Sequence, residues 1–291
     1  MARSRISRSR TLIAAADARA ERVRVRAQDE RQRHGSVDAV FEMVDRDGEV
    51  GGGIIAGALA YRLFIWLLPL TLVAVAGLGI AADASSESPG SAARSLGLSG
   101  LVSTSVAEAA EGSGRWYALL IGVPVLVYTT RSVLRVVIGA HRLVWTDVRA
   151  SAPRATLVET LRFLALLLCF PVITTTVNAA RAWSTAPGVL VSLFAIVPFA
   201  GVWLLITMRL PHRGADWKAL IPGALFFALG AEVLQAVIAY AIAPYSIAKQ
   251  GTYGVLGAAA ALLFALYLVS RLVVASAVLG ATLWERRTRD A

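Results

Sequence analysis

The fold class is decided by residues 54–80, which read IIAGALAYRLFIWLLPLTLVAVAGLGI. One charged side chain, that of Arg62, interrupts this apolar stretch. A helix needs about 20 mostly apolar residues to cross the roughly 30 Å of hydrocarbon in a bilayer, and this stretch is long enough. Its apolar residues do not alternate with polar ones, as they do in the strands of a transmembrane barrel. We therefore predict a membrane-spanning helix here.

Five further stretches have the same character, at 116–138, 157–177, 188–208, 219–243 and 254–284. The composition agrees with this, because 57% of the residues are hydrophobic and only 16% are charged, whereas about a quarter are charged in soluble domains. A proline inside a helix removes a backbone hydrogen bond and kinks the helix. Four stretches contain one away from their ends: Pro69, Pro124, Pro171 and Pro198. The sequence predicts an all-α integral membrane protein, a bundle of six transmembrane helices of which several are kinked.

The placement of Lys and Arg indicates the orientation of the chain, because connecting segments rich in these residues stay in the cytoplasm. Of the 29 basic residues, 22 fall at 1–53, 131–154, 209–218 and 286–289. The alternate segments hold four: Arg94, Arg115, Arg181 and Lys249. This alternation predicts that both termini are cytoplasmic.

Three regions follow from this topology. Residues 1–50 form an Arg-rich tail with an amphipathic approach helix, 51–285 form the membrane domain, and 286–291 form a short basic tail. The membrane domain is expected to contain an extracytoplasmic loop at about 81–115. The first region lacks the apolar core of a signal peptide. It is expected to be a solvated topology anchor or a segment that contacts anionic lipid. Nucleic-acid binding is not expected, because stacking aromatic residues are absent before Phe41.

Charged side chains within the spans are the best indication of function, because an arginine at the bilayer centre costs at least about 2.5–3.5 kcal/mol. At a rise of about 1.5 Å per residue, Arg62, Arg131 and Arg135 fall in the cytoplasmic half of their spans. Arg131 and Arg135 could instead extend to the surface. Arg62 is deeper and follows Tyr61, which favours a wet cavity open to the cytoplasm. Such a cavity suits phosphate or carboxylate, because arginine presents a fork of donors.

A second group of charges lies deeper. Glu232 and Arg271 both lie about 20 Å from the cytoplasmic end of their spans, which are consecutive and antiparallel. They are predicted to pair, either as a bridge between two helices or as part of a gate or substrate site. Glu159 and Arg162, three residues apart near the interface, are expected to form a local helix pair.

Several short motifs carry a resemblance to a known family. They begin with Ala58-Leu59-Ala60-Tyr61 through Pro69, and the later ones are Leu210-Pro211-His212-Arg213, Trp217, Ile221-Pro222-Gly223, Tyr253-Gly254, Gly257 and Leu279-Gly280-Ala281. Over roughly residues 40–285 the chain resembles the YihY/BrkB family of six-span bacterial inner-membrane proteins, historically labelled ribonuclease BN. The resemblance implies a multi-pass location in the bacterial inner membrane. The chain departs from the family pattern at Thr282, where Glu is usual, and at His141, where Asn is frequent.

The ribonuclease label requires residues that could carry out nuclease chemistry. A metal-dependent nuclease needs several His and carboxylate side chains at ligand spacing. The histidines are isolated and are expected at the membrane interface: His34, His141 and His212. Four acidic residues about one helical turn apart could attract a cation or form the solvated face of the approach helix: Asp38, Glu42, Asp45 and Glu49. Nucleotide-binding and hydrolase motifs are missing from the sequence. We therefore expect no enzyme, no catalytic residue, no metal site and no cofactor.

The intramembrane charges support a function in transport. The expected protein is a transporter or lipid translocator whose anionic or amphipathic substrate is held by charged and polar residues of four spans: Tyr61, Arg62, Arg131, Arg135, Glu232 and Arg271. Its expected partners are membrane lipids, including anionic lipid or another anionic substrate. The alternative is a non-transporting scaffold for envelope assembly, and a ribonuclease comes third.

Overall fold

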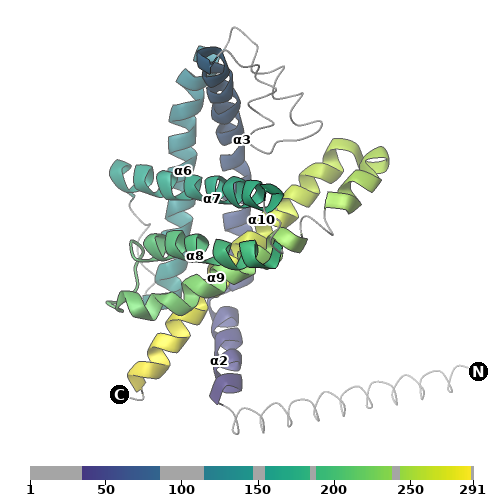
Figure 1. The fold of residues 1–291 in the computed structure, drawn as a ribbon. Helices are drawn as coiled ribbons and strands as arrows, with labels where there is room; N and C mark the ends of the chain where they lie inside the picture. The colour runs from purple at the N-terminus through teal and green to yellow at the C-terminus, as the bar shows by residue number, and fades with distance from the viewer. Residues whose placement is uncertain (1–34, 86–114, 147–154, 184–187, 238–242, 290–291) are drawn as a thin grey trace, which may run out of the picture. The chain divides into compact units, whose positions relative to one another are not determined.

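The computed structural model describes residues 35–85, 115–146, 155–183, 188–237 and 243–289 (Figure 1). Within these ranges there are seven helices and no strand. The helices are α2 (Gly35–Glu49), α3 (Gly52–Ser85), α6 (Arg115–Thr146), α7 (Leu157–Trp183), α8 (Gly188–Thr207), α9 (Trp217–Val237) and α10 (Ala243–Arg289). The all-α prediction is confirmed for the described residues.

The chain divides into two compact units, Met1–Glu49 and Val50–Ala291. The first contains α2, which lies within the segment 1–50 and has Val40 and Val44 exposed; its role as an approach helix stays a prediction. The second contains the other six helices. Gly51 precedes α3 with a φ of 67°, a left-handed conformation that glycine adopts without steric cost.

Five helical segments of the described chain are long and apolar enough to cross a membrane: Gly52–Gly77, Trp116–Trp145, Leu157–Val177, Trp217–Val237 and Ala259–Arg289. These coincide with five of the six predicted spans. The remaining predicted span coincides with α8, of which the apolar stretch Phe194–Thr207 has described side chains. The count of six spans and the cytoplasmic location of the termini stay predictions.

Four helices extend beyond their predicted bounds, and one of them is α7, which was predicted to end at residue 177 and continues to Trp183. Helix α3 continues to Ser85, into the segment expected as a loop at 81–115, because alanine, a strong helix former, recurs there. Residues 86–114 of that loop lie outside the described residues. Helix α6 continues past residue 138 to Thr146, where Val144 and Trp145 are buried against the protein. Helix α10 runs for 47 residues, which is more than a bilayer requires.

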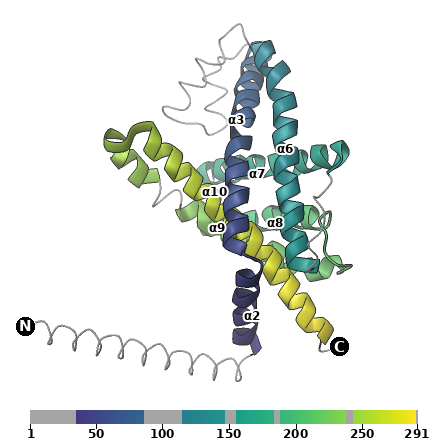
Figure 2. The same ribbon diagram turned by 180° about the vertical axis from the view of Figure 1, so that it is seen from behind.

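The helices of the second unit pack in a connected set. Helix α10 contacts α3, α6 and α9; α3 packs on α6; and α7 and α8 link α6 to α9. In both ribbon views α7 and α8 lie across α3 and α6 (Figures 1 and 2). Two buried tryptophans hold neighbouring helices together: Trp66 donates to Thr130 Oγ1 at 2.8 Å, and Trp203 donates to Ser276 Oγ at 3.1 Å.

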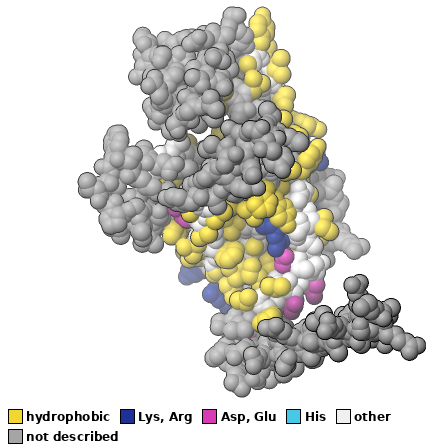
Figure 3. All heavy atoms as spheres, turned by 90° about the vertical axis from the view of Figure 1, so that its right-hand side faces the viewer, with side chains coloured by type: hydrophobic (Ala, Val, Ile, Leu, Met, Phe, Trp, Pro, Cys, Tyr) yellow, Lys and Arg dark blue, Asp and Glu magenta, His cyan; other side chains and the backbone are white. Residues whose placement is uncertain are grey.

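Large apolar side chains remain exposed on most of these helices, including Leu120, Tyr128, Phe194 and Val197. Figure 3 shows hydrophobic side chains over much of the described part of one face. Exposed apolar surface on this scale marks contact with another apolar phase. Together with the length of the helices, it is the surface expected of a protein surrounded by lipid.

Candidate functional site

The predicted site residues come from four helices. Tyr61 and Arg62 on α3 are exposed, as are Arg131 and Arg135 on α6. Glu232 on α9 and Arg271 on α10 are partly buried. Arg271 lines a groove, and the lining of that groove includes none of the other five. Of the six predicted residues, Arg271 is the one that lines this groove.

Arg131 has a structural contact. Its Nε donates a hydrogen bond to the carbonyl oxygen of Ala155 at 2.9 Å. Ala155 is buried and lies just before α7. A buried carbonyl without a partner is costly, so this bond stabilises the start of α7 against α6. The sequence did not reveal this bond, because the two residues are separated by the segment 147–154.

The groove at Arg271 lies between α9 and α10 and has a volume of about 360 Å³. Its lining contains one charged side chain among uncharged ones: Phe226, Gly230, Val233, Leu234, Val237, Leu268, Arg271, Leu272 and Ala275. We call it the Arg271 groove. Its chemistry combines a single guanidinium with apolar walls contributed by both helices.

Two glycines bring α9 close to α10. A Cβ at Gly223 would lie 2.6 Å from the carbonyl oxygen of Ser276 and 3.8 Å from Cα of Gly280. A Cβ at Gly230, two turns further along α9, would collide with the side chain of Leu272. Small residues at such positions let the backbones of membrane helices approach closely. The motifs around Gly223 and Gly280, far apart in the sequence, thus meet at one helix contact.

This contact also places the segments that carry Glu232 and Arg271 beside each other. Gly230 packs on Leu272, and Val233 lines the Arg271 groove. Glu232 is next to Val233 in the sequence and is partly buried. The direct pairing of Glu232 with Arg271 stays a prediction.

His141 lies in a buried environment. It is only 1% exposed and lines a small cavity with Trp145, Trp203, Thr207 and Ser276. Its Nδ1 is 3.2 Å from the carbonyl oxygen of Val137, and within the described part of the chain its Nε2 has no hydrogen-bond partner. His141 is therefore enclosed by protein where α6 continues past its predicted end, and its depth in the membrane stays a prediction. At about 10 Å³ the cavity has room for no more than a water-sized molecule, so it is no substrate site.

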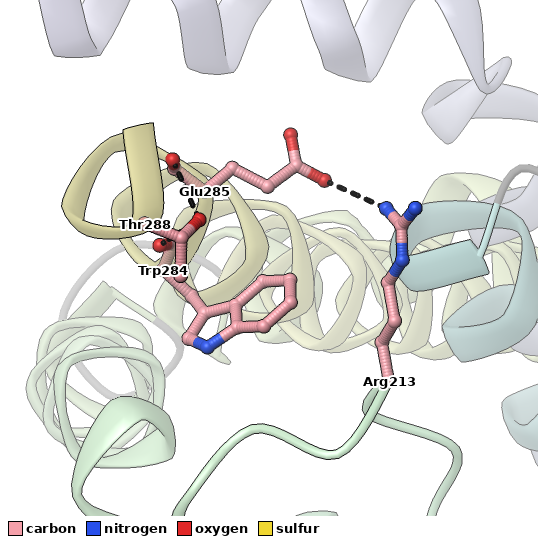
Figure 4. A network of polar contacts seen from close by, with 4 residues as sticks. All are labelled: Arg213, Trp284, Glu285 and Thr288. Carbon is pink, nitrogen blue, oxygen red and sulfur yellow. Dashed lines mark hydrogen bonds and ion pairs between the residues drawn. The ribbon is translucent and has the colours of Figure 1, made fainter. Parts of the chain in front are cut away.

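The motif Leu210-Pro211-His212-Arg213 forms the turn between α8 and α9. Arg213 has a φ of 53° and Gly214 a φ of 75°. A non-glycine residue with positive φ is uncommon and is held in place by its surroundings. Arg213 Nη1 lies 3.6 Å from Glu285 Oε1 on α10, and Figure 4 shows the side chain reaching from the turn toward that carboxylate. This motif therefore anchors the turn to the end of α10.

Among the described residues, the acidic ones of α2 included, no group of three or more His, Cys, Asp or Glu side chains is placed to hold a metal ion.

Comparison with known proteins gives the family. The model of the family described as Virulence factor BrkB matches residues 45–291. Neither a curated protein nor a solved structure matches the chain. The matched range includes α3 through α10, and with them the Arg213 turn and the contact between α9 and α10. With its long apolar helices, the chain is a multi-pass membrane protein and belongs to the Virulence factor BrkB family.

Proposed function

We propose that the protein binds an anionic amphiphile, such as an anionic phospholipid, in the Arg271 groove and moves it within the membrane. One observation carries the proposal. A groove of about 360 Å³ between two apolar helices holds a single cation, Arg271, in an otherwise uncharged lining. The proposed function is that of a transporter or lipid translocator and involves no chemical step.

The two parts of the groove suit the two parts of such a molecule. A guanidinium group binds phosphate through a planar fork of N–H donors, and these charge-assisted bonds are among the strong ones in proteins. The side chains of Val233, Leu234 and Leu268 offer an acyl chain an apolar surface. A neutral lipid would gain nothing from the arginine, and a small soluble anion would gain nothing from the walls.

The size of the groove limits how much of the substrate it holds. Ligand pockets in proteins are about 300–1,000 Å³, so this groove is at the small end of that range. It would hold the charged group and the adjoining part of a chain, while the rest of the chain lies along the lipid-facing surface. Because a guanidinium has several donors, Arg271 could contact Glu232 and a phosphate together.

The proposal narrows the site that the sequence predicted. It retains Arg271 as the group that binds the anion, with Glu232 beside it. Tyr61, Arg62, Arg131 and Arg135 come from α3 and α6 and stand outside the groove lining. Arg131 in addition stabilises the start of α7.

Protection of an introduced cysteine tests whether the groove is occupied. Val233→Cys would be made in a Cys169→Ala background of the full chain, purified in a neutral detergent, and its reaction with a small maleimide timed. Lysophosphatidylglycerol should slow the reaction at least about threefold. Lysophosphatidylcholine with the same acyl chain should slow it much less, because the cation of its choline group opposes the attraction between its phosphate and Arg271.

A matched control exists on α8. Val197 is an exposed valine outside the groove lining, like Val233 in exposure. At Val197→Cys the two lysolipids should slow the maleimide reaction equally. In Val233→Cys combined with Arg271→Gln, the two lysolipids should again slow the reaction equally. Equal protection of Val233→Cys by both lysolipids with Arg271 intact would contradict the proposal.

A further inference from the structure

A second pocket, of about 160 Å³, lies where α7 begins and α8 ends. Three helices and the residues just after α8 contribute its lining: Leu134, Ile138, Glu159, Arg162, Phe163, Leu166, Ile206, Arg209 and Leu210. We call it the Arg162–Arg209 pocket. It has no lining residue in common with the Arg271 groove.

We propose that the Arg162–Arg209 pocket is a binding site for one anionic phospholipid, whose phosphate is held by the two arginines. Arg162 comes from the second turn of α7, and Arg209 follows the last residue of α8. Within the described ranges neither guanidinium forms a hydrogen bond with the protein. Arg162 attracts the carboxylate of Glu159 electrostatically, as expected for the predicted local helix pair. Two cations from separate elements thus line one pocket.

The acidic residue in the lining is already engaged. Glu159 Oε2 accepts a hydrogen bond from the backbone N–H of Thr156 at 2.8 Å, and Thr156 Oγ1 accepts one from the backbone N–H of Glu159 at 3.2 Å. This reciprocal pair is a capping box, which satisfies two backbone donors at the start of a helix. The carboxylate is therefore held at the first turn of α7, and the two arginines leave the pocket with a net positive charge.

The rest of the lining favours a lipid over a soluble phosphate compound. Ile138, Phe163 and Leu166 form an apolar wall beside the arginines. A soluble phosphate would leave this wall in water, whereas the acyl chain of a phospholipid would cover it.

The depth of the two arginines also fits a headgroup. Arg162 lies near the beginning of the apolar segment Leu157–Val177, and Arg209 lies just beyond Thr207, the end of the apolar stretch of α8. Long basic side chains at the ends of membrane helices reach the headgroup region. Basic pockets between membrane helices are known binding places for anionic headgroups.

Native mass spectrometry of the full chain in detergent tests the site by counting bound lipids. Phosphatidylglycerol is added to wild-type protein and to a variant carrying both Arg162→Gln and Arg209→Gln. The number of tightly bound lipids per protein should be higher by one in the wild type. Each single replacement should lower the affinity for this lipid about tenfold, as expected for the loss of a charge-assisted contact. Arg287→Gln, which removes an exposed arginine of α10 outside the pocket, should retain the lipid.

Further measurements distinguish a phospholipid from a soluble phosphate compound and check that each variant is folded. Glycerol phosphate, which has no acyl chain, should not displace the lipid, and phosphatidylcholine should not fill the site. Arg162→Lys keeps the charge but loses the fork, so it should bind the lipid less tightly than wild type and more tightly than Arg162→Gln. Thermal unfolding of each variant checks that it is folded.

Three results would overturn the inference. They are displacement by glycerol phosphate, equal retention of phosphatidylcholine, and an unchanged lipid count in a folded double variant. Arg271→Gln should keep the lipid of this pocket. The outcome is therefore independent of whether the Arg271 groove carries a substrate.

Discussion

Gly223 shows how a single residue determines the distance between α9 and α10. Replacement by alanine would place a methyl group 2.6 Å from the backbone carbonyl oxygen of Ser276, and neither backbone can move without separating the helices. Gly223→Ala should lower the free energy of unfolding by about 1–3 kcal/mol, as overpacked cores do. The measurement is thermal unfolding of detergent-purified protein, followed by the loss of monodisperse material.

Gly201 provides the matched control for this change. It is an exposed helical glycine of α8, and an added Cβ would meet none of the described atoms within 4 Å. Since alanine is a better helix former than glycine by about 1 kcal/mol, Gly201→Ala should leave stability unchanged or raise it. Equal stability of the two variants would contradict the close contact.

The predicted pair of Glu232 and Arg271 calls for a double-mutant cycle. Removing one member of a buried pair leaves an uncompensated charge, which is strongly destabilising, whereas removing both leaves none. Glu232→Gln should therefore destabilise the protein more than Glu232→Gln combined with Arg271→Gln. The coupling energy from thermal unfolding should be about 0.5–3 kcal/mol. Additive effects would show that the two side chains do not interact.

Among the elements, α7 has a start to which the side chain of Thr156 contributes a cap. Thr156 both accepts a hydrogen bond from the N–H of Glu159 and donates its own N–H to that carboxylate. Thr156→Ala keeps the second bond and loses the first, and should lower the free energy of unfolding by about 1 kcal/mol. Thr156→Ser retains the hydroxyl and should cost much less. Indistinguishable thermal stabilities of these two variants would exclude the capping role.

The elements also show what the sequence could and could not predict. The apolar runs predicted the helices well, because a spanning helix needs little more than length and hydrophobicity. The starts of α7 and α8 agree with the predicted residues 157 and 188. The sequence did not predict that α6 extends to Thr146. The polar residues His141 and Arg142 lower the hydropathy there, so the predicted span ended before them. These residues continue a helix that packs on protein.

The site was harder to predict than the fold. Depth along a span depends on residue number alone, and it placed Glu232 and Arg271 deepest; both side chains are partly buried. Whether arginines at comparable depth share a pocket depends on the rotation and pairing of the helices, which depth does not give. Arg162 and Arg209 were not chosen, because the packing of three helices makes their pocket.

For the whole molecule, the orientation in the membrane is still a prediction from the basic residues. Protease-cleavable tags would be placed at residues 1 and 291 and near Gly90. In intact cells the two terminal tags should be protected from external protease, and the tag near Gly90 should be cleaved. The tags at the termini should become cleavable once the cells are permeabilised, which serves as the control. Cleavage of either terminus in intact cells would show that the number of spans is not even or that the orientation is inverted.

Movement of an anionic lipid through the protein tests the central claim most directly. The protein would be reconstituted into liposomes that contain phosphatidylglycerol with a fluorescent label on its acyl chain, and movement between leaflets would be followed by quenching of the outer leaflet. Wild-type protein should move this lipid faster than protein-free liposomes do, and faster than it moves the phosphatidylcholine analogue. Arg271→Gln should slow the movement about tenfold, the expected effect of losing one charge-assisted contact, while Arg287→Gln should leave it unchanged. A non-transporting scaffold would move the lipid no faster than protein-free liposomes do. Such a rate with folded, correctly inserted wild-type protein would contradict the account. Equal rates for wild type and Arg271→Gln would contradict it as well.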